Sequence, residues 1–414
     1  MSGHRNPPVR GAATAPAGRG ASRPPAGSPV RPRALALGMA VLLSACATSQ
    51  TGRSGAVTTD ELLAGTALDS TDSPAAPVAP AEVLALSPEM RAFIDAHVDR
   101  AGGGSLKLHQ LATAIIDEDT FGVTYDDRTR TAAEAFRARR GNCLSFSTMF
   151  VAMAREVGLD VQYQEVEIPP DWTLDNDTYV LNQHVNVYVK LEPAAPKVVD
   201  FNIADFKSSY EMERIPDARA LAHYYNNVGV ERMLAGDTAS ALSHFRRALA
   251  ENDLAFSPAW VNLGTLYQRN GRTAEAEAAY LQALEADGSD LVAMSSLARL
   301  YDRLGDREQA AVYRKKVVHH RNLNPYYRYE LARRAYLAHD YRAAISHLKY
   351  AVRKRPKEDQ FCFLLGLSYF ELGNEEEARR WFDRAEELAA TDALKRRYSS
   401  KADTVLRRPE SSPR

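Results

Sequence analysis

The chain has 414 residues, 45% of them apolar and 25% charged, so it can form two or three folded domains and is neither collagen-like nor disordered throughout. Its 52 basic and 53 acidic residues give a net charge of −1, which argues against binding to nucleic acid through overall charge. Six Arg and no acidic residue lie within residues 1–45, which leaves the rest of the chain at −7. Three cysteines cannot form a disulfide framework, so each needs its own explanation.

Residues 1–45 are typical of an export signal. A Pro-, Gly- and Arg-rich stretch is followed by an uncharged run at 34–45 that is too short to span a bilayer as a helix. The run ends in Leu43-Ser44-Ala45-Cys46, which resembles the lipobox of bacterial lipoproteins. The resemblance implies lipidation of Cys46 and, because no Asp follows it, a place in the outer membrane facing the periplasm. The alternative is a chance Ala/Leu stretch before a buried cysteine.

Residues 46–84 are rich in Ser, Thr, Gly, Ala and Pro, a composition that predicts a flexible tether, with one short helix as an option at 59–63. Folded sequence is expected from residue 85 onward.

The segment 85–215 predicts a mixed, α+β domain built around one apolar helix at 143–157. Asn142 can cap the start of this helix, which places Cys143 in its first turn. Unpaired amides and the helix dipole stabilise a thiolate at that position. Cys143 is therefore a candidate nucleophile.

Beyond residue 158 the apolar pattern changes to period two, which predicts strands at 161–168, 183–191 and 197–201. A hairpin between the last two strands would bring Asp200 close to His184. A cysteine at a helix start, a histidine on a strand and an acid on the next strand can supply a nucleophile, a general base and the group that orients the base. The acidic stretch 171–177 before the histidine strand is interpreted as a solvated loop, and the alternative is that it borders a substrate cleft.

In this order of elements the chain resembles the transglutaminase-like branch of papain-type thiol enzymes, over about residues 86–210. The resemblance rests on Gly141-Asn142-Cys143, His184-Val185-Asn186-Val187 and Val199-Asp200-Phe201. It implies that Cys143 attacks an acyl carbon, His184 takes and returns the proton, and Asp200 fixes the imidazole tautomer. The implied activity is that of a cysteine protease, amidase or acyltransferase. The Cys143 backbone N–H would stabilise the oxyanion, with Tyr125 a candidate second donor.

Each residue of this set also has a structural alternative. Cys143 could be a small core residue, His184 a structural histidine and Asp200 a turn or edge group. It is their order along the chain, each on the expected element, that favours a triad.

Residues 216–391 contain five repeats of 34 or 35 residues, followed at 392–414 by an expected solvating helix and a disordered end. Small residues recur at two positions of every repeat: Gly229, Gly264, Ala298, Ala332 and Gly366, and twelve residues later Ala241, Ala276, Ala310, Ala344 and Ala378. This pattern resembles that of tetratricopeptide (TPR) repeats, which form an all-α solenoid of helix pairs. Arg314 and Ala335 depart from it, and Cys362 is expected to be a buried packing thiol.

The TPR resemblance implies a concave face that binds a peptide or a partner helix. By repeat register that face would carry Asn226, Gln268, Arg269, Arg299, Arg303, Tyr326, Tyr329, Arg333 and Tyr336. Residues 299–357 contain sixteen basic and five acidic residues, which favours an anionic partner: an acidic protein, an envelope polysaccharide or a lipid head group. A merely solvated helical surface is the alternative, and the export signal disfavours nucleic acid.

Together these features predict a lipid-anchored envelope protein with a thiol hydrolase or acyltransferase domain acting on protein or peptide amides, whose repeats recruit substrate or partner. Hydrolysis is favoured over crosslinking because a thioester in an open cleft meets water more often than a positioned amine. The alternative is a catalytically inactive scaffold lipoprotein that mediates protein–protein interactions. No metal or nucleotide motif is present, so no cofactor is expected.

Overall fold

The computed structural model describes residues 57–68, 73–175, 178–201, 212–389 and 392–406, without the side chains of 167–183, 393 and 403–406. The expected signal segment 1–45 and Cys46 lie outside the described residues. Within the described part of the chain, no helix is both long enough and apolar enough to cross a membrane.

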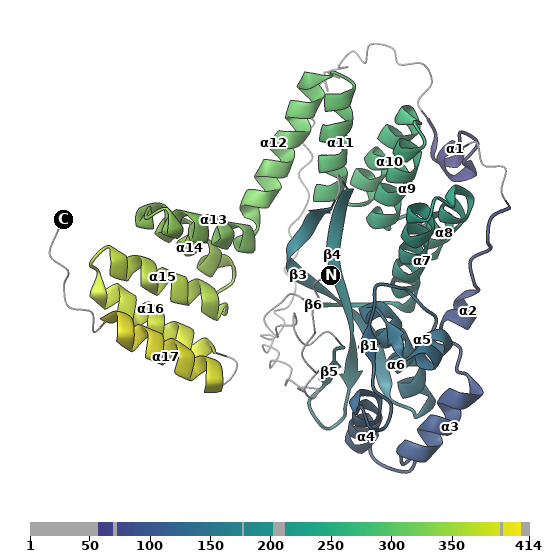
Figure 1. Ribbon diagram of the computed structural model, residues 1–414, viewed down its shortest axis with the longest axis horizontal. Coiled ribbons are helices and arrows are strands. Elements are labelled where there is room, and N and C mark those ends of the chain that lie inside the picture. The colour runs from purple at the N-terminus through teal and green to yellow at the C-terminus, as the bar shows by residue number, and fades with distance from the viewer. Residues whose placement is uncertain (1–56, 69–72, 176–177, 202–211, 390–391, 407–414) are drawn as a thin grey trace, which may run out of the picture.

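The N-terminal domain has four helices and an antiparallel sheet of order β5-β4-β3-β6, and α6 is the helix that packs directly on the sheet, as Figure 1 shows. The helices are α3 (Pro88–His97), α4 (Gly104–Ile116), α5 (Ala132–Ala138) and α6 (Cys143–Glu156). The strands are β3 (Asp160–Asp175), β4 (Thr178–Lys190), β5 (Lys197–Val199) and β6 (Met212–Ile215). A separate parallel pair joins β1 (Thr124–Tyr125) to β2 (Arg140–Gly141).

Helix α6 is the centre of this domain. Every residue from Leu144 to Ala154 is buried, as its apolar circumference predicts. The Asn142 side chain accepts a hydrogen bond from the Ser145 amide and caps the helix start, so the predicted cap is confirmed. The cap fixes where the helix begins and hence where Cys143 lies.

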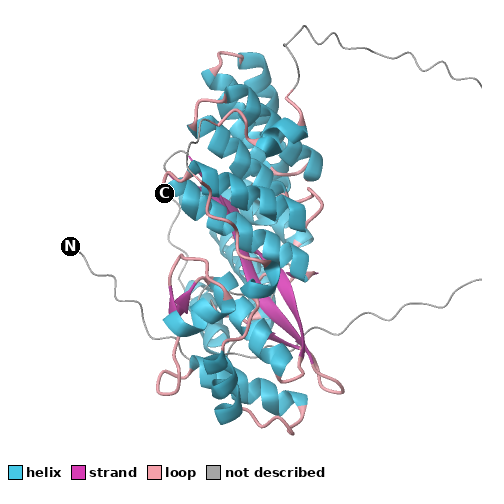
Figure 2. Cartoon of the chain, turned by 90° about the vertical axis from the view of Figure 1, so that its right-hand side faces the viewer, coloured by secondary structure: helices cyan, strands magenta, loops and turns pink. Residues whose placement is uncertain are grey.

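The hairpin of β3 and β4 is longer than the sequence suggests. The stretch 171–177 was expected to be a solvated loop, but pairing resumes after a bulge, with Trp172 opposite Leu181 and Asp175 opposite Thr178. Strand β6 was not predicted. The loop was predicted from the acidic residues of 171–177, but the residues between and after them favour strands, and the pairing of β3 with β4 continues there. Figures 1 and 2 show the hairpin running along the helical half, where β4 contacts α11 and β3 contacts α13.

The C-terminal half contains five antiparallel helix pairs and a final helix. The pairs are α7 (Asp217–Leu234) and α8 (Thr238–Glu251), α9 (Ser257–Arg269) and α10 (Thr273–Ala286), α11 (Leu291–Arg303) and α12 (Arg307–Leu323), α13 (Pro325–Leu337) and α14 (Tyr341–Lys354), and α15 (Asp359–Glu371) and α16 (Glu375–Leu388). The final helix is α17 (Asp392–Leu406).

The recurring small residues lie where paired helices touch. A Cβ atom added at Gly229 or Gly264 would lie 2.6 Å from the ring of Phe245 or Tyr280, which leaves room for glycine only. The alanines of the second repeat position, such as Ala241 and Ala276, are fully buried. The physical reason for the repeat is therefore close helix packing.

The hydrophobic core of the array is interrupted between α12 and α13. One core cluster ends at Tyr313 and the next begins at Ala332. Helix α12 buries only Ala310 and Tyr313, and Arg314, which takes the place of an apolar residue, pairs instead with Asp302 at 2.5 Å. The departure noted at Arg314 thus coincides with a break in packing.

The segment expected to be a free tether differs from that expectation in its described parts. Residues 57–68 and 73–84, here called the strap, include α1 (Thr59–Ala64) and α2 (Pro80–Val83) and pack on the first two repeats. Leu62 is fully buried, and its carbonyl accepts a hydrogen bond of 2.6 Å from the hydroxyl of Tyr267. The partners come from residues far along the sequence, so the local composition does not reveal them.

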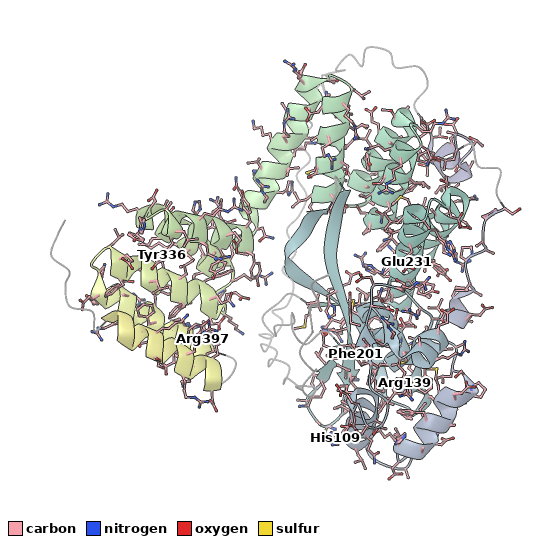
Figure 3. The ribbon with its side chains drawn as sticks, viewed as in Figure 1. His109, Arg139, Phe201, Glu231, Tyr336 and Arg397 are labelled. Atoms are coloured by element: carbon pink, nitrogen blue, oxygen red, sulfur yellow. The ribbon has the colours of Figure 1, made fainter. Side chains whose placement is uncertain are left out.

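Polar contacts join the N-terminal domain to the first repeat. Glu165 on β3 accepts from Arg219 and His223 on α7, at 2.6 and 2.5 Å. Glu231 on α7, labelled in Figure 3, accepts from the backbone N–H of Thr129 at 2.7 Å. Thr129 in turn accepts from the side chain of Asn142, so this link reaches the cap of α6.

Candidate active site

The start of α6 is held by a buried hydrogen-bond network. The Ser145 hydroxyl donates to the side-chain oxygen of Asn142 at 2.8 Å and accepts from the backbone N–H of Arg130 at 2.9 Å. A Cβ atom at Gly141 would lie 2.7 Å from that of Ser145, so only glycine fits directly before the cap. The first turn, with Cys143 at its first position, is therefore fixed from several sides.

The structure brings together the three residues predicted to form a triad. Nε2 of His184 lies 2.8 Å from both carboxylate oxygens of Asp200. The imidazole ring of His184 also hydrogen-bonds with the Cys143 thiol. Since the carboxylate occupies Nε2, Nδ1 is the ring nitrogen left for the sulfur.

The pKa values of this pair move in opposite directions. Burial alone would raise the pKa of Cys143, but the hydrogen bond and charge of His184 and the backbone N–H of Val185 together lower it. Burial alone would lower the pKa of His184, but its hydrogen bonds to Asp200 and Cys143 raise it to about 10. Both directions favour the ion pair of a thiolate and an imidazolium over the neutral pair.

The three groups differ in exposure. His184 and Asp200 are buried, at 3% and 8% exposure, whereas Cys143 is partly exposed. Cys362 is fully buried on α15, where burial raises the pKa of its thiol to about 11. The expectation that Cys362 is a buried packing thiol is confirmed.

Asn186 is a site residue to which the sequence analysis gave no role. Its side-chain N–H donates to Asp200 at 2.9 Å, so it orients the carboxylate that holds His184. Asn186 lies two residues after His184 on β4, so strand alternation puts both side chains on the same face of the sheet. This spacing is the sequence signal that could have identified Asn186 as a site residue. Tyr125, considered as an oxyanion donor, is 54% exposed on β1 and paired in register with Gly141.

The residues predicted to face a repeat partner fall into two groups. Arg269, Arg303 and Arg333 are exposed. The others are partly or fully buried: Asn226, Gln268, Arg299, Tyr326, Tyr329 and Tyr336.

Several of the buried members have partners within the chain. Asn226 accepts a hydrogen bond from Asn262 on α9 at 2.9 Å, and Gln268 accepts from Tyr280 at 3.0 Å. The ring of Tyr329 packs against that of Phe361, with centroids 4.9 Å apart. Asn226 therefore joins α7 to α9, contrary to its expected place on a partner-binding face.

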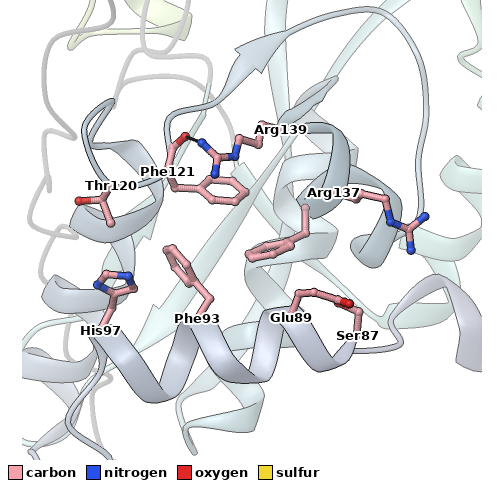
Figure 4. Close-up of a pocket in the computed structure, with 9 residues that line it drawn as sticks. Ser87, Glu89, Phe93, His97, Thr120, Phe121, Arg137 and Arg139 are labelled. Carbon is pink, nitrogen blue, oxygen red and sulfur yellow. Dashed lines mark hydrogen bonds between the residues drawn. The ribbon is translucent and has the colours of Figure 1, made fainter.

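A separate cavity of about 380 Å³ lies between α3 and α5 (Figure 4). The rings of Phe93, Phe121 and Phe136 line it, and Arg139 lies over Phe121 and donates to its carbonyl at 2.8 Å. No triad residue lines this cavity. Among the described residues, no group of three or more His, Cys, Asp or Glu side chains is placed to hold a metal ion.

Comparison with known families agrees with this architecture. The family model of the transglutaminase-like superfamily matches residues 97–195, which include Cys143 and His184. Two tetratricopeptide-repeat models match residues 256–318 and 329–393. The chain contains a transglutaminase-like domain followed by TPR repeats. Asp200 and the first helix pair lie outside the matched ranges.

Three similar solved structures each cover less than half of the chain. A crystal structure of MamA is 18% identical, covers 41% of this chain and 91% of its own, and has a TM-score of 0.23. YrrB, described as a TPR protein with an unusual peptide-binding site, is 18% identical. Its match covers 43% of this chain and 92% of YrrB, with a TM-score of 0.23. Pseudomonas aeruginosa pilF is 14% identical. Its match covers 46% of this chain and 86% of pilF, with a TM-score of 0.25. No curated protein matches the sequence.

Proposed function

We propose that the transglutaminase-like domain is a thiol hydrolase or acyltransferase that acts on protein or peptide amides through a thioester on Cys143. The observation that carries the proposal is the His184–Asp200 contact of 2.8 Å beside a thiol whose pKa is lowered. A buried cysteine that served only for packing would have its pKa raised, as that of Cys362 is. A scaffold would not require this arrangement.

The reaction proceeds in two steps. The Cys143 thiolate attacks the amide carbonyl carbon, and the protonated His184 gives its proton to the departing amine as the C–N bond breaks. His184, now neutral, removes a proton from water, which attacks the thioester; the C–S bond breaks, the carboxylic acid leaves, and the Cys143 thiolate and protonated His184 are restored. An amine in place of water would yield a new amide, and hydrolysis is favoured where the site meets solvent. Asp200 stabilises the imidazolium in both steps.

A trapping experiment tests the proposal. The chain is incubated with a peptide library and quenched in acid, and adducts on Cys143 are identified by mass spectrometry. A thioester on Cys143 that is absent in Cys143→Ala supports the enzyme. A folded chain with no adduct and no substrate turnover identifies the domain as a scaffold.

The repeats would recruit a protein or peptide partner, which the TPR architecture supports. Arg303 and Arg333 are the exposed basic candidates on α11 and α13. Charge reversal at both should weaken a salt-sensitive interaction in a pull-down. Capture that is unaffected by salt and by both changes would remove these residues from the partner surface.

The lipid anchor at Cys46 remains a proposal based on the lipobox-like sequence. Because residue 57 already belongs to the docked strap, the chain from Cys46 to it spans no more than about 40 Å even when fully extended. An anchored protein would therefore keep its first repeats close to the outer membrane, on the periplasmic side. Cys46→Ala should release the protein from the membrane fraction, and unchanged partition would refute lipidation.

A further inference from the structure

The end of α12 meets α13 and α14 in the middle of the repeat array (Figure 1). Basic side chains of these helices form a compact cationic cluster. The guanidinium groups of Arg328 and Arg353 lie 5.0 and 5.2 Å from the centre of the Tyr350 ring. The Tyr350 hydroxyl donates to the carbonyl of Leu323 at 3.1 Å, which fixes the ring between the helices. Stacking on a fixed ring orients both guanidinium groups in advance of any ligand.

His347 belongs to the cluster, and Arg321 lies on the neighbouring end of α12. Nη1 of Arg328 lies 3.2 Å from Nδ1 of His347, and because arginine can only donate, Nδ1 is the acceptor and Nε2 carries the proton. Arg321, at the end of α12, lies with its guanidinium 4.4 Å from the centre of the Tyr327 ring. Nε of Arg321 is buried and has no hydrogen-bond partner, an arrangement that costs free energy unless a ligand supplies an acceptor.

These cations are not neutralised within the described part of the chain. Arg321, Arg328 and Arg353 form no ion pair with a described acidic side chain, whereas Arg314 and Arg333 nearby are paired with Asp302 and Glu330. Like charges gathered on one rigid scaffold repel one another, and an anion relieves that repulsion. Exposure of Arg353 and partial exposure of Arg328 leave the cluster accessible to solvent.

We propose that this cluster is a binding site for a phosphate group, formed by Arg328 and Arg353 with His347 and Arg321 at its sides. A carboxylate carries one charge and is satisfied by one two-pronged arginine contact. Two guanidinium groups on one ring, with His347 beside them and Arg321 on the adjoining helix end, exceed that need and match the charge and several acceptor oxygens of a phosphate. The exposed Leu323, whose carbonyl accepts from Tyr350, would contact the apolar part of a phosphate-bearing molecule.

Isothermal titration of the full chain with inorganic phosphate at constant ionic strength tests the site. We expect one bound phosphate per chain and roughly tenfold weaker binding in Arg353→Gln, the loss typical of one charged hydrogen-bond partner. Arg342→Gln, an exposed arginine at the start of α14, loses the same charge and should bind as the native chain does. Arg328→Lys keeps the charge but not the planar contact and should also weaken binding.

Vesicles separate the two sources of phosphate. The Cys46→Ala chain is floated with phosphatidylcholine vesicles that contain or lack phosphatidylglycerol. Binding that requires phosphatidylglycerol and is lost in Arg353→Gln identifies a lipid head group, and phosphate binding without vesicle binding identifies a soluble phosphate. Succinate binding more tightly than phosphate, or phosphate binding that is absent or equal in Arg353→Gln and the native chain, would overturn the proposal.

Discussion

His184 and Asp200 are joined through both carboxylate oxygens at 2.8 Å, a symmetric contact that fixes the imidazole ring in one orientation. The two residues come from β4 and from the position directly after β5, and the register that pairs Val187 with Val199 brings them together. The orientation of the base is therefore set by strand pairing, and the thiol is placed separately by the cap of α6.

The first prediction concerns the ionisation of Cys143. Because its pKa is lowered and that of His184 is raised to about 10, alkylation by iodoacetamide should already be fast near neutral pH. Asp200→Asn should remove the charge that stabilises the imidazolium and move the midpoint of the alkylation profile to higher pH. Mass spectrometry of the labelled peptides, measured across pH, gives both profiles.

Cys362 supplies the internal control, since burial raises the pKa of its thiol to about 11. It should stay unlabelled in the native chain at neutral pH, and Cys143→Ala should abolish rapid labelling. Faster labelling of Cys362 than of Cys143 would contradict the thiolate–imidazolium pair.

The second prediction assigns Asn186 a positioning role. Asn186→Ala removes the hydrogen bond of 2.9 Å to Asp200, which is worth about 1.5–3 kcal/mol when the acceptor is charged. The less constrained carboxylate should hold His184 less well, so the Cys143 alkylation midpoint should rise, though by less than in Asp200→Asn. Tyr188→Phe, two residues further along β4, is the matched control. Equal midpoints in Asn186→Ala and Tyr188→Phe would leave Asn186 with a packing role only.

The third prediction concerns the junction of the two domains. Burial would raise the pKa of Glu165, but its hydrogen bonds to His223 and Arg219 lower it from 4.5 to about 2. A carboxylate with a depressed pKa stabilises the folded state above the unfolded pKa and loses that contribution as pH falls. We expect about 3 kcal/mol of unfolding free energy to disappear between pH 4.5 and about 2.

Urea denaturation at several pH values measures the contribution of Glu165 to the unfolding free energy. Glu165→Gln should lower stability at neutral pH and flatten the acid dependence. Glu213→Gln changes an exposed carboxylate directly opposite Glu165 in the sheet and should leave the profile unaltered. Parallel acid profiles for the native chain and Glu165→Gln would show that the junction does not depend on this carboxylate.

The sequence allows the triad to be predicted because each member follows from a local rule. The cap at Asn142 places Cys143, and period-two alternation with a short turn places His184 and Asp200. The five repeats are predictable for a similar reason, since close helix packing demands small residues at a fixed interval.

The strap and the tip of the β3–β4 hairpin are not predictable in this way. Leu62 and the hydroxyl of Tyr267 lie about two hundred positions apart in sequence, and no local pattern in the strap marks their meeting. Asn226 shows a related limit, because repeat register fixes the helix on which a residue lies but does not decide whether Asn262 will cover it.

The last prediction tests whether the strap is part of the folded unit. Leu62 is fully buried against the repeats, so Leu62→Ala should cost about 2–5 kcal/mol of unfolding free energy or detach the strap. Tyr267→Phe removes only the hydrogen bond to the Leu62 carbonyl and should cost about 1 kcal/mol. Thr66→Ala, at an exposed position of the strap, is the control. Hydrogen exchange of residues 58–68 should accelerate in the first two variants alone. Fast exchange in the native chain would instead show that the strap is a flexible tether, as the sequence predicts. The folded domains could then lie farther from a membrane anchor at Cys46.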